Sequence, residues 1–191
     1  RANFDYTRSG NPNFKILENV LKGIENSNYC TVFSSGISAV TAIVSSLKSG
    51  DKILCESNLY GCTIRMFEKI FRKFGIETFY LDFTNKEYID QISKVKPALI
   101  WLESPTNPLL KILNLKEICS EANLRKIPVV VDNTFCTAVI QKPLELGATL
   151  SLISTTKFIN GHSDALGGAV ITNDESWNNK MIFSQKSLGL N

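Results

Sequence analysis

The sequence predicts an α/β fold in which a mostly parallel sheet carries helices on both faces. Two observations lead to this prediction. Short, continuous apolar runs, such as the three valines at 129–131, are typical of strands that are buried on both faces. Amphipathic segments of helical length separate these runs along the chain, as the crossovers between parallel strands require.

The elements follow in order from this alternation. The first helix is expected over residues 13–27, where one face carries Ile16, Leu17, Val20, Leu21 and Ile24. Apolar runs predict strands at 29–33, 52–55, 76–81, 97–102, 128–131, 148–154 and 168–172. Amphipathic segments predict helices at 36–47, 63–74, 86–94 and 115–123, and a last segment covers 175–187. No repeat, low-complexity tract or linker interrupts the pattern, so we expect one domain over residues 1–191.

The composition excludes several functional classes. Of the 191 residues, 43% are hydrophobic and 20% are charged, which is ordinary for a globular domain. A net charge of +3 with dispersed lysines argues against a nucleic-acid partner. Acidic residues interrupt every apolar run, so no membrane span is expected. Because the chain begins with arginine and shows no signal-peptide pattern, we expect an internal fragment of a cytoplasmic protein.

The five cysteines include no C-x-x-C pair, and there is one histidine. This pattern has no zinc-ligand spacing, so no metal is expected, and it argues against a disulfide framework. We expect buried, reduced thiols, with Cys62 as the exception because of the motif in which it lies.

Polar residues follow several predicted strands at the point where each strand ends. They are Ser35 and Gly36, residues 103–107, Asp132, and residues 154–157. Ligands of open α/β sheets bind outside the carboxyl ends of the strands. The sequence therefore predicts a binding site at this edge of the sheet.

Residues 154–164 form the most informative segment. Lys157 leaves an apolar run and is flanked by Ser154 and Thr156, with a glycine turn and His162 behind it. A desolvated lysine amine can form a Schiff base with an aldehyde cofactor, and the hydroxyls can bind a phosphate. The alternatives are a surface lysine, and the S-x-x-K motif of penicillin-binding enzymes, whose S-D-N and K-T-G companions are absent.

Two further residues fit a bound, phosphorylated cofactor. Gly36 opens a predicted helix, whose N-terminus attracts anions, although a plain helix N-cap explains it as well. Asp132 ends a buried strand, where a carboxylate needs a cationic partner or several donors. A helix cap or a structural ion pair is the alternative for Asp132. His162 is expected to be a structural hydrogen-bonding residue rather than a base.

Segment 154–164 resembles the lysine signature of the Cys/Met-metabolism pyridoxal-phosphate enzymes, the family of cystathionine synthases and lyases. The same family carries motifs similar to Y-x-R-x-x-N-P at residues 6–12, E-S-P-T-N-P at 103–108 and V-D-N-T-F at 131–135. The resemblance implies the aspartate-aminotransferase-like fold type I. It also implies that residues 1–191 are the cofactor-binding large domain, without the C-terminal domain whose arginine binds the substrate carboxylate.

The resemblance implies a role for each matching residue. Lys157 would bind pyridoxal 5'-phosphate and shuttle protons, and Asp132 would pair with the pyridinium N–H. The backbone amides of Gly36 and Ile37 would hold the phosphate with Ser154 and Thr156. Tyr60 would stack on the ring and act as a second acid or base.

The resemblance also implies roles for residues outside the segment that carries Lys157. Asn107 would lie near the phenolic oxygen of the cofactor, with Glu103 in support. Tyr6 and Arg8 would contact the phosphate of a neighbouring subunit's cofactor, which implies a homodimer or homotetramer with shared active sites.

Within the family, S-T-T-K at 154–157, G-G-A-V at 167–170 and L-G-L at 188–190 look most like bacterial cystathionine γ-synthases. This implies γ-replacement, in which an O-acyl-L-homoserine and L-cysteine give cystathionine. Cys62 instead matches methionine γ-lyases. The alternatives are therefore a C–S lyase (cystathionine γ-lyase, cystathionine β-lyase or methionine γ-lyase) and, from another class, a noncatalytic assembly subunit.

Overall fold

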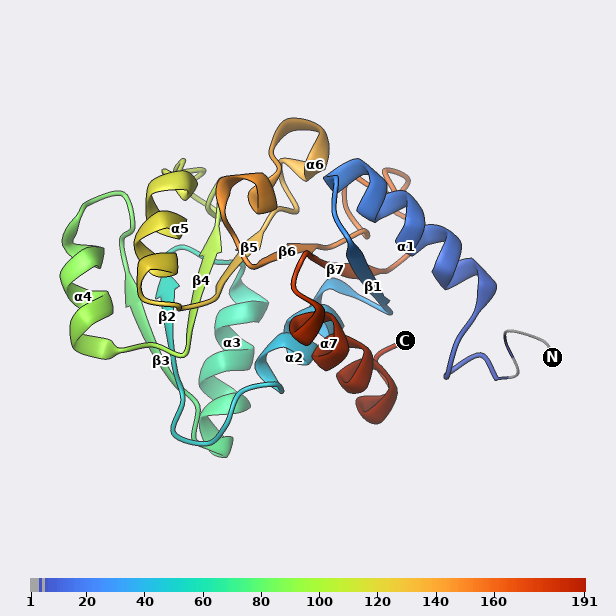
Figure 1. Ribbon diagram of the computed structural model, residues 1–191, viewed down its shortest axis with the longest axis horizontal. Coiled ribbons are helices and arrows are strands. Elements are labelled where there is room, and N and C mark those ends of the chain that lie inside the picture. The colour runs from blue at the N-terminus through green and yellow to red at the C-terminus, as the bar shows by residue number, and fades with distance from the viewer. Residues whose placement is uncertain (1–3, 5) are drawn as a thin grey trace.

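The computed structural model, which describes residue 4 and residues 6–191, contains a seven-stranded sheet in the order β1-β7-β6-β5-β4-β2-β3 (Figure 1). The strands are β1 (Tyr29–Phe33), β2 (Lys52–Glu56), β3 (Glu77–Leu81), β4 (Leu99–Glu103), β5 (Val129–Asp132), β6 (Leu150–Ile153) and β7 (Gly168–Thr172). Only β7 runs antiparallel to its neighbours, β1 and β6. The predicted α/β fold with a mostly parallel sheet is confirmed.

The helices are α1 (Pro12–Glu25), α2 (Gly36–Val44), α3 (Gly61–Lys69), α4 (Glu87–Val95), α5 (Leu115–Leu124), α6 (Thr137–Ile140) and α7 (Glu175–Leu188). Short 3₁₀ turns occur at η1 (Phe71–Phe74) and η2 (Pro143–Leu146). The single helix expected over 63–74 is divided between α3 and η1. The elements α6 and η2 were not expected, because four residues are too few to show a helical period. Within the described part of the chain, no helix is long and apolar enough to cross a bilayer.

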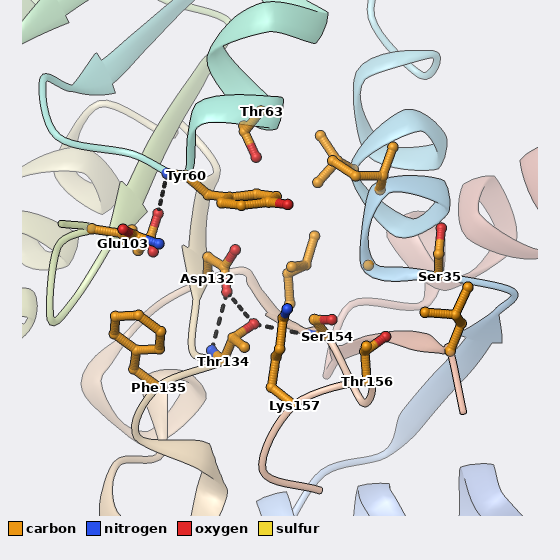
Figure 2. A pocket seen from close by; sticks show the side chains of 16 residues that line it. Ser35, Tyr60, Thr63, Glu103, Asp132, Thr134, Phe135, Ser154, Thr156 and Lys157 are labelled. Carbon is orange, nitrogen blue, oxygen red and sulfur yellow. Dashed lines mark hydrogen bonds between the residues drawn. The ribbon is translucent and has the colours of Figure 1, made fainter. Parts of the chain in front are cut away.

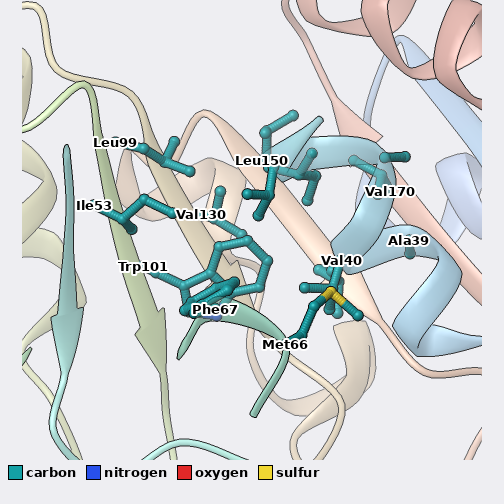
Figure 3. Packing of buried hydrophobic residues seen from close by; sticks show 14 of the residues in the cluster. Ala39, Val40, Ile53, Met66, Phe67, Leu99, Trp101, Val130, Leu150 and Val170 are labelled. Atoms are coloured by element: carbon teal, nitrogen blue, oxygen red, sulfur yellow. The ribbon is translucent and has the colours of Figure 1, made fainter. Parts of the chain in front are cut away.

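Helices cover both faces of the sheet. Side chains of α2, α3 and α7 pack on one face, whereas those of α4, α5 and α1 pack on the other. Strand β4 shows how one sequence serves both layers: Leu99 and Trp101 join the first cluster, and Ile100 and Leu102 join the second. Figure 3 shows the first cluster, where the rings of Phe67 and Trp101 meet edge to face at 5.3 Å.

Helix α1 is present as predicted, but most of its apolar face is uncovered. Leu21 is buried against β1 and β7, whereas Ile16 and Val20 are 63% and 52% exposed. Leu17 and Ile24 are also exposed. The helix lies at the β1 end of the sheet (Figure 1). Leu21 therefore reaches the sheet, whereas Ile16 and Val20 remain exposed.

All five cysteines are free thiols, as expected. Three of them are buried, namely Cys30, Cys55 and Cys119, whereas Cys62 and Cys136 are half-buried. Burial raises the pKa of Cys119 to about 12, so this thiol remains protonated and acts as a small apolar side chain.

The core can be tested on α5, which carries a matched pair of positions. Ile118 is fully buried, and Leu124 is 76% exposed. Ile118→Ala should lower the free energy of unfolding by about 2–5 kcal/mol, because it removes buried methyl groups and leaves a cavity. Leu124→Ala should change it by no more than about 0.5 kcal/mol. Urea denaturation of the two variants measures the difference, and equal losses would contradict the packing described for α5.

Candidate active site

A cavity of about 390 Å³ lies at the carboxyl edge of the sheet, a volume that suits a small organic ligand. All of the predicted site residues except Tyr6 and Arg8 line it. The lining residues are Ser35, Gly36, Ile37, Val40, Tyr60, Thr63, Glu103, Asn107, Asp132, Thr134, Phe135, Leu152, Ser154, Thr156, Lys157 and Leu166. Figure 2 shows their side chains converging from several elements that are distant in sequence.

The sheet register brings the acidic groups together. Glu103 ends β4 and Asp132 ends β5, and the two residues are direct partners in the parallel pairing. Register partners project to the same face, which here is the face covered by α2 and α3. The neighbouring strand β6 then leads into the loop that carries Lys157.

Asp132 is a buried carboxylate with no cationic partner among residue 4 and residues 6–191. Its side chain accepts hydrogen bonds from the Thr134 backbone N–H at 3.0 Å and the Thr134 hydroxyl at 2.6 Å. Burial raises the pKa of Asp132, and these two hydrogen bonds oppose the rise. No described residue forms an ion pair with Asp132, so the structural ion pair considered as an alternative is absent there. A carboxylate in this setting fits a ligand that brings its own positively charged N–H group.

Helix α2 begins at the cavity wall. The Ser35 hydroxyl caps it by accepting a hydrogen bond from the Ser38 backbone N–H at 3.0 Å. The first N–H groups of a helix have no partner inside the helix, and they attract anions. A Cβ atom added to Gly36 would lie 2.8 Å from Cβ of Ser154. Only glycine therefore lets this helix terminus approach the Ser154 hydroxyl closely enough to share a phosphate group.

Lys157 follows Ser154 and Thr156 in the loop after β6. Its backbone N–H donates to the Ser154 carbonyl at 3.3 Å, and its exposed side chain extends into the cavity (Figure 2). The Thr156 hydroxyl is already engaged, since it donates to the Gly167 carbonyl at 3.2 Å and accepts from the Gly167 N–H at 3.0 Å. Thr156 would have to redirect its hydroxyl proton to bind a phosphate.

Tyr60 forms the opposite wall. Its ring lies across the cavity from Lys157, and its backbone N–H donates to Glu103 Oε2 at 2.8 Å (Figure 2). A hydrogen bond with Cys62 raises the pKa of the Tyr60 phenol. The guanidinium of Arg65 lies 3.7 Å from Sγ of Cys62. Tyr60, Cys62 and Arg65 therefore form one polar group at the mouth of the cavity.

Tyr6 and Arg8 lie outside this cavity. Both are exposed, and the Arg8 guanidinium donates to the Lys186 carbonyl at 3.0 Å, at the C-terminal end of α7. His162 does not line the cavity either. One of its ring nitrogens, Nδ1, lies 2.6 Å from the Asn160 carbonyl, which agrees with its expected structural role.

The sequence reasoning missed Thr134 as a site residue. Its hydroxyl donates to Asp132 and accepts from the Ser154 backbone N–H at 2.9 Å, so it joins the ends of β5 and β6. The sequence signals were a hydroxyl two residues after a strand-ending aspartate and the V-D-N-T-F motif at 131–135, in which Thr134 lies. Phe135 was also missed; it lines the cavity and packs against Phe158, with the ring centres 6.4 Å apart.

The fold and the site define a class of protein, the pyridoxal-phosphate-dependent enzymes of fold type I, whose solved structures match the whole chain. Within that class, the chain belongs to the family of Cys/Met metabolism PLP-dependent enzymes, which its sequence matches over residues 1–191. Pyridoxal 5'-phosphate is therefore its cofactor, and the S-x-x-K hydrolase interpretation is excluded. The residues around the cavity fit that cofactor, because an unpaired buried carboxylate and a helix N-terminus lie on either side of Lys157.

The chain is similar both to proteins named as lyases and to proteins named as synthases. Cystathionine gamma-lyase from Dictyostelium discoideum is 38% identical over 98% of this chain and 49% of its own length. A probable cystathionine gamma-synthase from Herpetosiphon aurantiacus is 38% identical over 97% of this chain and 58% of its own. The structure of cystathionine gamma synthase from Xanthomonas oryzae pv. oryzae superposes with a TM-score of 0.95 at 35% identity, over 100% of this chain and 49% of that one. The chain thus spans about half the length of the curated relatives it matches.

The close approach of α2 to Ser154 yields a prediction. Gly36→Ala should lower the free energy of unfolding by about 1–3 kcal/mol through overpacking, and it should weaken the binding of pyridoxal phosphate. Gly23→Ala in α1 is the matched control, since a Cβ atom there has no neighbour within 4 Å. That control should be neutral or stabilising by about 0.5–1 kcal/mol. Urea denaturation and a cofactor titration measure both effects, and unchanged binding by Gly36→Ala would contradict the role given to the helix terminus.

The hydroxyl of Thr134 yields another prediction. Thr134→Val should lower the free energy of unfolding at pH 7 by about 1.5–3 kcal/mol, because a buried carboxylate loses a donor. The loss should shrink as the pH falls and Asp132 takes up a proton, since the hydrogen bond favours the ionised form. Thr134→Ser retains the hydroxyl and should behave like the wild type. Denaturation curves at several pH values test this, and a pH-independent loss would show that the lost acceptor for the Ser154 N–H, not the hydrogen bond to Asp132, matters.

Proposed function

We propose that the protein catalyses a γ-replacement that joins an O-acyl-L-homoserine and L-cysteine into cystathionine, in the cytoplasm. The observation that carries this proposal is the convergence of Lys157, Asp132 and Tyr60 on one cavity beside the N-terminus of α2. The motifs at 154–157 and 167–170 favour a synthase. The similar Xanthomonas synthase was solved in complex with aminoacrylate and cysteine, which supports a thiol as the second substrate.

Each residue of the cavity has a defined task in this proposal. Pyridoxal phosphate supplies an aldehyde that condenses with amines and a ring that withdraws electrons from the substrate α-carbon. Lys157 holds the cofactor and moves the α-proton with its amine Nζ. Asp132 keeps a proton on the ring nitrogen. Tyr60, a phenol whose pKa is raised by its hydrogen bond with Cys62, would cover the ring and could give a proton to a leaving group.

The remaining predicted residues hold the cofactor in place. The N–H groups of Gly36 and Ile37, with the hydroxyls of Ser154 and Thr156, bind the phosphate. Asn107 contacts the ring from the loop after β4. Phe135 and Leu166 supply apolar lining on that side of the cavity.

We further propose that residues 1–191 are the large domain of a longer protein that works as a homodimer or homotetramer with shared sites. Two observations support this. Arg8 and Tyr6 lie away from the cavity of their own chain, so a neighbouring subunit is the place where they can act. The exposed apolar side chains of α1 supply a surface that a partner would cover.

A C–S lyase remains the second candidate, and Cys62 is the observation that favours it. Its thiol contacts both Tyr60 and Arg65, so it can alter the proton affinity of the group nearest the substrate. Elimination and replacement share their first steps and differ in whether a thiol adds before the product leaves.

A product assay separates the two candidates. The complete protein is incubated with pyridoxal phosphate, O-succinylhomoserine and cysteine, and the products are identified by mass spectrometry. We expect cystathionine as the main product. If only 2-oxobutanoate and succinate form, the protein is an eliminating lyase and the γ-replacement proposal is wrong.

The role of Lys157 is tested by substitution. Lys157→Ala should abolish both the yellow colour of the cofactor-loaded protein and its turnover, because no other described lysine lines the cavity. Lys116→Ala, at an exposed position of α5, should keep both. Retained turnover by Lys157→Ala would overturn the assignment, and a complete wild-type protein that never turns yellow would revive the noncatalytic assembly subunit.

A further inference from the structure

Glu103 is a second buried carboxyl group in the cavity. It is 6% exposed, and one of its oxygens, Oε2, accepts the backbone N–H of Tyr60. Its register partner Asp132 projects to the same face, so two acidic side chains occupy adjacent positions at the carboxyl ends of β4 and β5 (Figure 2). The sequence pattern and the family membership leave Glu103 without a role of its own.

Comparison with Glu56 shows how unusual this setting is. Glu56 is fully buried at the end of β2, and both of its oxygens accept backbone N–H groups, from Asn58 at 3.0 Å and from Phe83 at 2.9 Å. Glu103 has a single such donor, and no described residue forms an ion pair with it. A buried carboxyl group with one donor and an acidic neighbour is more stable as the neutral acid.

The two carboxyl groups differ in the hydrogen bonds that favour their ionised forms. Burial and the nearby charge of Asp132 raise the pKa of Glu103 to about 8. Burial raises the pKa of Asp132 too, but two hydrogen bonds from Thr134 favour its ionised form. The other titratable side chains that line the cavity are Tyr60 and Lys157. The hydrogen bonds from Thr134 therefore favour a proton on Glu103 over a proton on Asp132.

We propose that Glu103 is a positioning residue: as a neutral acid it holds Tyr60 over the cavity and leaves Asp132 as the anion that would keep a proton on the cofactor's ring nitrogen. The meaning of this arrangement for catalysis rests on the proposed function. Tyr60 is fixed through its own backbone, directly before α3, so a shift of Glu103 moves the ring. Were Glu103 ionised in place of Asp132, the negative charge would lie away from the ring nitrogen.

Two substitutions separate the two tasks. Glu103→Gln retains a carbonyl oxygen that can accept the Tyr60 N–H but has no proton to release. Glu103→Asp retains the titratable group but is one methylene shorter, so it cannot reach the Tyr60 N–H from an unmoved strand. A general loss of structure would affect both variants alike, whereas the proposal predicts opposite effects.

The first measurement uses the complete protein without cofactor. The infrared difference spectrum between wild type and Glu103→Gln at about pH 6 should contain the carbonyl band of a protonated carboxylic acid, and this band should vanish as the pH rises through about 8. Because the folded protein binds this proton more tightly than the unfolded chain, wild-type stability should fall across that range relative to Glu103→Gln. Absence of the band at pH 6 would overturn the proposal. If Glu103→Gln does not fold, the difference spectrum is taken between wild type and Glu103→Asp. A carbonyl band that titrates at the same pH in both proteins would likewise overturn the proposal.

The second measurement uses the cofactor-loaded protein. At pH 7, Glu103→Gln should retain kcat/KM and pyridoxal phosphate affinity close to wild type, whereas Glu103→Asp should lose about 10²-fold in kcat/KM through misplacement of Tyr60. Equal losses in the two variants would contradict the positioning role. The infrared result does not depend on the reaction, so a protein that forms no cystathionine but shows the band refutes the proposed function and leaves the protonated Glu103 standing.

Discussion

The parallel register of the central strands determines where every polar group of the cavity lies. Because β4, β5 and β6 run in the same direction, their carboxyl ends meet at one edge. Glu103 pairs with Asp132, and the next strand begins the loop to Lys157. A slip of one residue in β5 would turn Asp132 to the opposite face and present a valine to the cavity. The valine run therefore has a chemical task as well as a packing task.

The number of donors given to each carboxyl group then sets the electrostatics of this edge. Glu56 receives backbone N–H groups on both oxygens, Asp132 receives two hydrogen bonds from Thr134, and Glu103 receives one. Three buried acidic residues of similar chemistry thus have different roles: Glu56 holds a loop in place, Asp132 serves as the anion, and Glu103 serves as the neutral acid. Their positions in the sheet do not explain these differences, because each residue simply ends a strand. The differences come from the loops that supply the donors: Thr134 follows β5 itself, whereas Tyr60 follows β2.

The fold and part of the cavity could be predicted from local patterns in the sequence, whereas the roles of Ile37, Tyr60 and Asn107 were implied only by the family resemblance. Apolar runs gave the strands, and polar residues at the strand ends gave Gly36, Asp132 and Lys157. The features that could not be predicted are contacts between groups that only the folded structure brings together. The Thr134 hydroxyl turns back to Asp132, and the Thr156 hydroxyl is taken up by Gly167. The helical periodicity of α1 also does not reveal that most of its apolar side chains remain exposed in place of packing on the sheet.

The contact between Gly36 and Ser154 also restricts how this sequence can change over time. A side chain at position 36 would meet the Cβ atom of Ser154, so substitution there becomes tolerable only after position 154 shrinks to glycine. That exchange would delete the serine hydroxyl. At Gly168 no compensation exists, because an added Cβ would collide with the backbone of Ser35. Positions 36 and 154 are thus epistatic, whereas position 168 is fixed by the main chain alone.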